Sequence, residues 1–118
     1  MKVAKILLLS IAGSVSAVAD PQQEGERLFA LKVKQVLSSK CFACHGEEPK
    51  KIKGEFNLTT REGLLKGGES EEPGMVPGKP EVSSIVLAIE RKDEDLAMPP
   101  KENDKLTPWQ VDVIKSWV

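Results

Sequence analysis

The chain has 118 residues, 30% of them charged, and a formal net charge of −1 at pH 7. This length allows one small domain beside any targeting segment, and the charge gives no indication of a nucleic-acid partner. Because such a chain buries only about two-thirds of its unfolded surface and has three Phe, two Trp and no Tyr, its core would gain stability from a large apolar cofactor.

Residues 1–19 have the pattern of a secretory signal peptide. Lys2 and Lys5 precede a short apolar stretch, and Ala17-Val18-Ala19 has the small residues of a cleavage site. The apolar stretch is interrupted by Ser and Gly and is shorter than the roughly 20 apolar residues that a membrane-spanning helix needs. We therefore expect an exported, periplasmic protein that does not span a membrane after cleavage, with residues 20–118 as its one domain.

The segment from Glu24 to Lys40 is predicted to be an amphipathic helix. Its apolar side chains fall on one face and lead directly into two cysteines. The positions on this face are Phe29, Val33, Val36, Leu37, Cys41 and Cys44. The helix therefore carries the run Cys41-Phe42-Ala43-Cys44-His45 at its end.

This Cys-x-x-Cys-His run is typical of covalent haem attachment. Two cysteines three residues apart at a helix end can each form a thioether bond to one vinyl group of the same porphyrin, and the adjacent histidine becomes the proximal iron ligand. We therefore predict one haem c per chain, held by Cys41, Cys44 and His45.

Other uses of these three residues meet specific obstacles. The chain has no further Cys or His, so a zinc site with four ligands would need a carboxylate or a partner chain. A thioredoxin-like dithiol is expected beside a βαβ pattern, which is missing. A disulfide suits an exported protein, but it closes a very short loop and leaves His45 without a role. A haem-free disulfide or dithiol module remains the alternative.

Two short helices are predicted in the middle of the chain. After a polar loop over residues 47–57, the first begins at Thr59, in a Thr-x-x-Glu capping box, and ends at Gly67. A loop with two Pro-Gly turns follows. The second helix is expected from Pro80 to about Arg91. Its buried positions would be Val82, Ile85, Val86 and Ile89.

The last predicted helix follows an acidic, proline-bearing loop over residues 92–105. It begins at Thr107, with Pro108 in its first turn and Gln110 completing a capping box. Its buried side would be formed by Leu106, Val111, Ile114, Trp117 and Val118. No stop signal follows, so we expect a fragment or the front of a longer protein. Because no hairpin or repeat signal occurs, the fold class is predicted to be all-α.

The sixth iron ligand has two candidates in the sequence. A second histidine is excluded, since His45 is the only one. Met98 is followed by two prolines, whose fixed φ would stiffen the loop and hold the sulfur toward the iron, whereas Met75 lies in a looser stretch rich in Gly and Pro. A lone methionine can also fill a gap in a core. Spacing alone therefore leaves the choice open.

Four segments resemble the planctomycete-type cytochrome c domain, a relative of the class I cytochromes c. They are Cys-Phe-Ala-Cys-His-Gly at 41–46, Thr-Thr-Arg-Glu-Gly-Leu-Leu-Lys-Gly-Gly-Glu-Ser at 59–70, Val-Pro-Gly-Lys-Pro-Glu at 76–81, and Asp-Glu-Asp-Leu-Ala-Met-Pro-Pro-Lys at 93–101, with Trp117 near the end. The resemblance implies a small cytochrome c-like helical domain packed around one covalently bound haem. It also implies that the first and last helices cross, with Phe29, Val33 and Val36 against Ile114 and Trp117.

The resemblance further implies the ligand set and the use of the iron. Cys41 and Cys44 would be the thioether residues, His45 the proximal ligand and Met98 the distal one. Members of the family commonly carry this domain at the front of long multidomain proteins, in agreement with the missing stop signal.

An iron with histidine and methionine in its two axial positions has no open site and exchanges single electrons. We therefore expect a non-enzymatic electron-transfer domain, whose redox donor and acceptor proteins are not identified by the sequence. The alternative is a haem-c domain of a larger redox enzyme with an open sixth site, although no distal histidine is present for such chemistry.

Overall fold

The computed structural model describes residues 9–15, 18 and 20–118. The predicted signal features at Lys2, Lys5, Ala17 and Ala19 lie outside the described residues. Within the described part the chain forms only helices and turns, with no strand, which confirms the predicted all-α class. No helix in this part is both long and apolar enough to cross a membrane.

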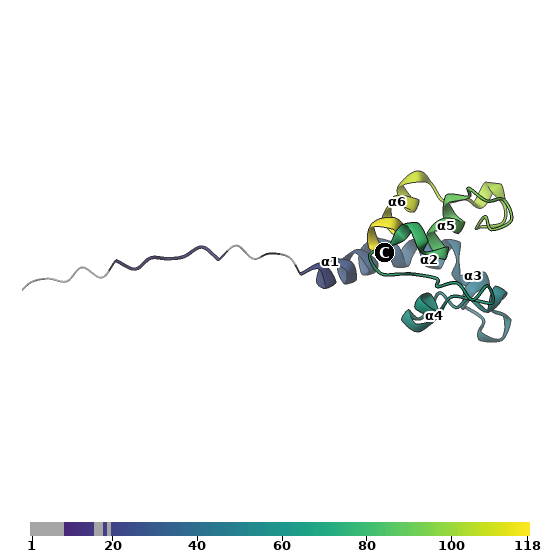
Figure 1. Cartoon of the computed structure of the whole chain (residues 1–118), viewed down its shortest axis with the longest axis horizontal. Coiled ribbons are helices and arrows are strands. Elements are labelled where there is room, and N and C mark those ends of the chain that lie inside the picture. Colours follow the sequence, from purple (N-terminus) through teal and green to yellow (C-terminus); the bar gives the residue numbers. More distant parts are fainter. Residues whose placement is uncertain (1–8, 16–17, 19) are drawn as a thin grey trace, which may run out of the picture.

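The first helical segment runs without interruption from Pro21 to Lys40 (Figure 1). It consists of α1 (Pro21–Leu28), the π-helical turn η1 (Phe29–Val33) and α2 (Lys34–Lys40). The helix begins earlier than the predicted Glu24, because the Asp20 carboxylate accepts a hydrogen bond from the Gln22 backbone N–H at 3.1 Å and Pro21 fills the first position. Val33, Val36 and Leu37 are buried as predicted, and Phe29 is half-buried.

The middle of the chain is mostly loop, as expected. After the one-turn helix α3 (Phe42–His45), it contains the 3₁₀ turns η2 (Pro49–Lys51) and η3 (Lys53–Glu55) and the short helix α4 (Arg61–Lys66). The predicted cap at Thr59 is wrong by one residue. The Thr60 hydroxyl accepts from the Gly63 backbone N–H at 3.0 Å, because the Thr59 hydroxyl donates instead to the Asn57 side chain at 2.7 Å.

The helix predicted from Pro80 to Arg91 is broken into two pieces. They are the 3₁₀ turn η4 (Pro80–Val82) and α5 (Ser84–Glu90). The break occurs at Ser83, which is fully buried, because its hydroxyl donates to the Lys79 carbonyl at 2.8 Å and accepts from the Val76 backbone N–H at 2.9 Å. Val82 is consequently 52% exposed, contrary to prediction, whereas the predicted core positions Ile85, Val86 and Ile89 are buried.

The last helix, α6 (Pro108–Trp117), follows the 3₁₀ turn η5 (Glu102–Asp104). Its predicted capping box is confirmed, with hydrogen bonds in both directions between Thr107 and Gln110 at 3.2 and 2.9 Å. Leu106 and Ile114 are buried as predicted, and Val113 is a buried position that the sequence pattern did not include. The remaining predicted positions, Val111, Trp117 and Val118, are half-buried.

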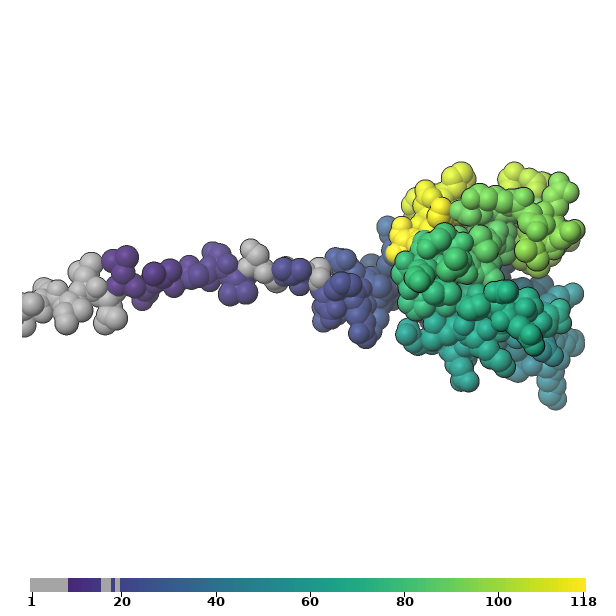
Figure 2. Space-filling model, viewed as in Figure 1, coloured from purple at the N-terminus to yellow at the C-terminus, as the bar shows by residue number. Residues whose placement is uncertain are grey.

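The first and last helices pack together, as the family resemblance implied. The rings of Phe29 and Trp117 are 5.4 Å apart between centroids, and one core cluster includes Val33, Val36 and Ile114. In Figure 2 the green and yellow C-terminal part lies over the blue-to-teal part that carries α3 and α4. The Glu90 carboxylate ties α5 to α6 by pairing with Lys115 at 2.9 Å. This hydrogen bond, helped by one from Lys92, lowers the pKa of Glu90.

Two leucines of the first helical segment test where the core lies. Leu37 is 1% exposed and Leu31 is 57% exposed. Leu37→Ala is expected to lower the free energy of unfolding by about 2–5 kcal/mol, because it leaves a cavity. Leu31→Ala should change it by less than about 0.5 kcal/mol. Denaturant unfolding of the purified protein measures both, and equal losses would contradict the packing described above.

Candidate haem site

The three residues of the predicted attachment motif lie within one helical turn. The Cys41 backbone N–H donates to the Leu37 carbonyl at 2.8 Å, as a last bond of the first helical segment. The Cys41 carbonyl in turn accepts from the backbone N–H groups of Cys44 and His45, at 3.2 and 3.0 Å. The first helix therefore positions Cys41 directly, and Cys41 positions the other two residues.

The two cysteines are free thiols in different surroundings. Cys41 is half-buried and packs against the edge of the core, whereas Cys44 is exposed. Burial, with a smaller effect from neighbouring Cys44, raises the pKa of the Cys41 thiol to about 11, although Lys40 opposes the shift. The Cys41 thiol is therefore neutral at pH 7, and its sulfur lies in the apolar surroundings that suit the edge of a porphyrin ring.

His45 is held by a hydrogen bond to the chain that folds back over it. Its Nδ1 lies 3.0 Å from the Phe56 carbonyl oxygen. Because a carbonyl can only accept, this hydrogen bond requires a hydrogen on Nδ1, and in the neutral tautomer of that kind Nε2 has the lone pair. A partner of this kind fixes the tautomer and the orientation of a metal-binding histidine and increases its basicity. The Phe56 ring also lies edge-on to the imidazole, with centroids 5.9 Å apart.

Gly46 allows the chain to turn back immediately after His45. Its φ is +143°, and a Cβ at this position would lie 2.5 Å from the Thr59 methyl and 2.7 Å from the Asn57 Oδ1. The returning chain is fixed by a hydrogen bond from the Leu58 backbone N–H to the His45 carbonyl at 2.8 Å. Neither Gly46 nor Phe56 was predicted from the sequence to have a role at this site. A glycine directly after the motif was the one signal of such a turn.

Met98 comes from a different part of the fold, the loop between α5 and η5. Its backbone N–H donates to the Ala88 carbonyl at 3.0 Å, and 39% of the residue is exposed. The other candidate, Met75, is only 6% exposed. Of the two thioethers, that of Met98 is the more accessible to an external group.

One contact joins the Met98 loop to the attachment motif. The ammonium group of Lys40, which directly precedes Cys41, donates to the Asp104 carbonyl at 3.1 Å. Asp104 belongs to η5, the turn that follows Met98 along the chain. The loop is therefore linked to the end of the helix that carries the motif.

These residues fit a haem by the chemistry of their donor atoms. Two free thiols and an imidazole with an available Nε2 lie on one turn, and an accessible thioether lies on a linked loop. The described surface has one hollow between α5 and α6 and another between α1 and α4. Neither hollow is lined by Cys41, Cys44, His45 or Met98. In the described part, no three Cys, His, Asp or Glu side chains are grouped as a metal-ion site.

Comparison with known proteins agrees with the sequence resemblance. The family model described as Planctomycete cytochrome C matches residues 41–102. The matched span contains the attachment motif, α4, α5 and the Met98 loop. No curated protein and no solved structure matches the chain.

Two glycines test the turn behind His45. Gly46→Ala is expected to cost about 2 kcal/mol or more, because it combines an unfavourable φ with overlap against Thr59. Gly25 lies inside α1 with no heavy atom within 4 Å of an added Cβ, so Gly25→Ala should raise stability by about 0.5–1 kcal/mol. Thermal unfolding of the two variants measures the contrast. A harmless Gly46→Ala would show that the turn is not required.

Proposed function

The chain belongs to the planctomycete cytochrome C family, and on this premise we propose that it is a periplasmic electron-transfer domain with one haem c. A cytochrome c domain implies a haem-c electron carrier and typically not an enzyme. The observation that carries the proposal is the single helical turn that presents Cys41, Cys44 and His45, with the His45 Nδ1 already engaged by Phe56.

Each proposed residue has one task in this function. Cys41 and Cys44 would form the thioether bonds to the haem, His45 would bind the iron through Nε2, and Met98 would supply a second iron ligand through its sulfur. The bound haem supplies an iron that alternates between the ferric and ferrous states. The Phe56 carbonyl keeps the imidazole from rotating, and the hydrogen bond between Met98 and Ala88 holds the backbone beside the sulfur.

The proposed domain boundary is supported by the start of the first helix. Cleavage after Ala19 would leave Asp20 as the first residue, and Asp20 is the N-cap of α1. Removal of residues 1–19 would therefore leave every described helix intact. This supports, together with the signal-peptide pattern, a mature domain of residues 20–118 that is exported to the periplasm.

Covalent haem is the first expected outcome. The protein, expressed with its signal peptide and the c-type maturation machinery, should carry one haem per chain that survives denaturation, measured by the pyridine haemochrome spectrum. Cys41→Ser or Cys44→Ser should leave one thioether bond, which the spectrum resolves. His45→Ala should yield no stable holoprotein, because ligation and folding are coupled. Purified protein without covalent haem would refute the proposal.

The two methionines separate the possible sixth ligands. Met98→Ala is expected to give a high-spin ferric spectrum and carbon monoxide binding in the ferrous state, because it removes the sixth ligand. Met75→Ala should keep the low-spin spectrum and instead lower stability by about 2–5 kcal/mol, because Met75 is buried. Optical spectra and thermal unfolding record both effects. A low-spin Met98→Ala protein would assign the ligand elsewhere.

A further inference from the structure

Arg91 occupies a backbone conformation that a glycine would hold with less strain. It is the C-cap of α5, with φ 57° and ψ 30° in the left-handed region. Glycine is the usual residue at such a helix end, since a side chain is disfavoured there. A residue that persists in an unfavourable conformation points to a role for its side chain.

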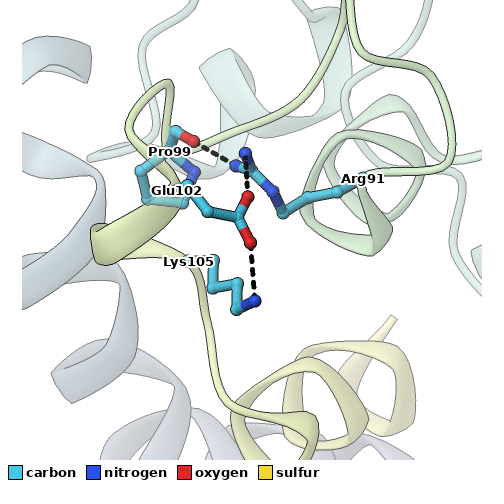
Figure 3. A network of polar contacts seen from close by, with 4 residues as sticks. All are labelled: Arg91, Pro99, Glu102 and Lys105. Carbon is cyan, nitrogen blue, oxygen red and sulfur yellow. Dashed lines mark hydrogen bonds and ion pairs between the residues drawn. The ribbon is translucent and has the colours of Figure 1, made fainter.

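The Arg91 side chain lies against the loop that carries Met98. Its Nη1 donates to the carbonyl of Pro99, and its Nη2 pairs with the Glu102 carboxylate at 3.0 Å (Figure 3). The Arg91 side chain is only 18% exposed, and Pro99 is buried. The guanidinium therefore binds the loop directly after Met98 and again at the start of η5.

The loop is fixed to the same helix end by its backbone. The Ala88 carbonyl accepts from the N–H of Arg91 at 3.2 Å and from the N–H of Met98 at 3.0 Å. Glu102, which holds the far side of the guanidinium, is itself paired with Lys105 at 2.6 Å (Figure 3). The backbone is therefore held on both sides of the Met98 side chain. The Met98 N–H donates to the Ala88 carbonyl, and the carbonyl of the next residue, Pro99, accepts from the Arg91 guanidinium.

We propose that Arg91 is a positioning residue for the sixth ligand, which holds the Met98-Pro99 loop against α5 and so keeps the Met98 thioether directed at the iron. This inference rests on the proposed function, in which Met98 is that ligand. The guanidinium suits this role because its two terminal nitrogens, fixed in one plane, donate to the Pro99 carbonyl and to the Glu102 carboxylate at the same time. A lysine has a single ammonium nitrogen, which does not match this planar two-nitrogen geometry.

The experiment measures how readily imidazole replaces Met98 in the ferric holoprotein. Arg91→Gly removes the side chain and also relieves the backbone conformation, so loss of the fold is not expected to confuse the result. Arg91→Lys keeps the charge but removes the fork. Both variants should bind imidazole about tenfold more tightly than the unmodified protein, with a weaker methionine-to-iron absorption band.

Two reference variants make the result decisive. Lys92→Gln removes a neighbouring cation whose side chain is 79% exposed, and its imidazole affinity should match that of the unmodified protein. Met98→Ala should bind imidazole most tightly. If Met98→Ala does so while both Arg91 variants remain unchanged, Arg91 has no positioning role and the proposed function stands. If Met98→Ala itself is unchanged, Met98 is not the ligand, and both the ligand assignment and the role of Arg91 are refuted.

Discussion

The hydrogen bond between the His45 ring and the Phe56 carbonyl is the constraint on which the rest of the proposed site depends. It joins His45, the last residue of the attachment motif, to Phe56 on the loop that leads away from the motif and then folds back against it. The return is possible because Gly46 adopts a φ that other residues avoid. It is reinforced by the Leu58 backbone N–H, which bonds to the carbonyl of His45 itself. His45 is therefore held through both its ring and its backbone.

The same loop is packed closely by glycines downstream. A Cβ on Gly63 would overlap the Asn57 carbonyl, and a Cβ on Gly74 would overlap the Phe56 ring. These contacts bring α4 and the segment after it against the residues that hold His45. A domain with so few aromatic residues has little apolar area to bury, so close backbone packing around one aromatic ring is an efficient way to fix the orientation of the imidazole.

The features predicted correctly from the sequence depend on neighbouring residues. The Thr107–Gln110 capping box and the buried face of Val33, Val36 and Leu37 follow from spacing within one helix. The predictions that were wrong, the cap of α4 and the unbroken helix from Pro80 to Arg91, concern side chains with more than one possible hydrogen-bond partner. Thr59 and Thr60 could each cap α4, and Asn57 decided the outcome by engaging Thr59. The helix break at Ser83 likewise depends on a folded turn that the helical pattern does not contain.

The two sides of the proposed iron site are built in different ways, and this explains why one was easier to predict. The proximal side is a contiguous motif on a helical turn, so sequence spacing alone predicts it. The distal side depends on contacts between residues far apart in the chain, from Arg91 to Pro99 and from Lys40 to Asp104. The proposed electron transfer would require both proposed ligands, His45 and Met98, to remain in place while the iron changes charge. A loop anchored at the end of α5 and again at the end of α2 provides that restraint without depending on the iron itself.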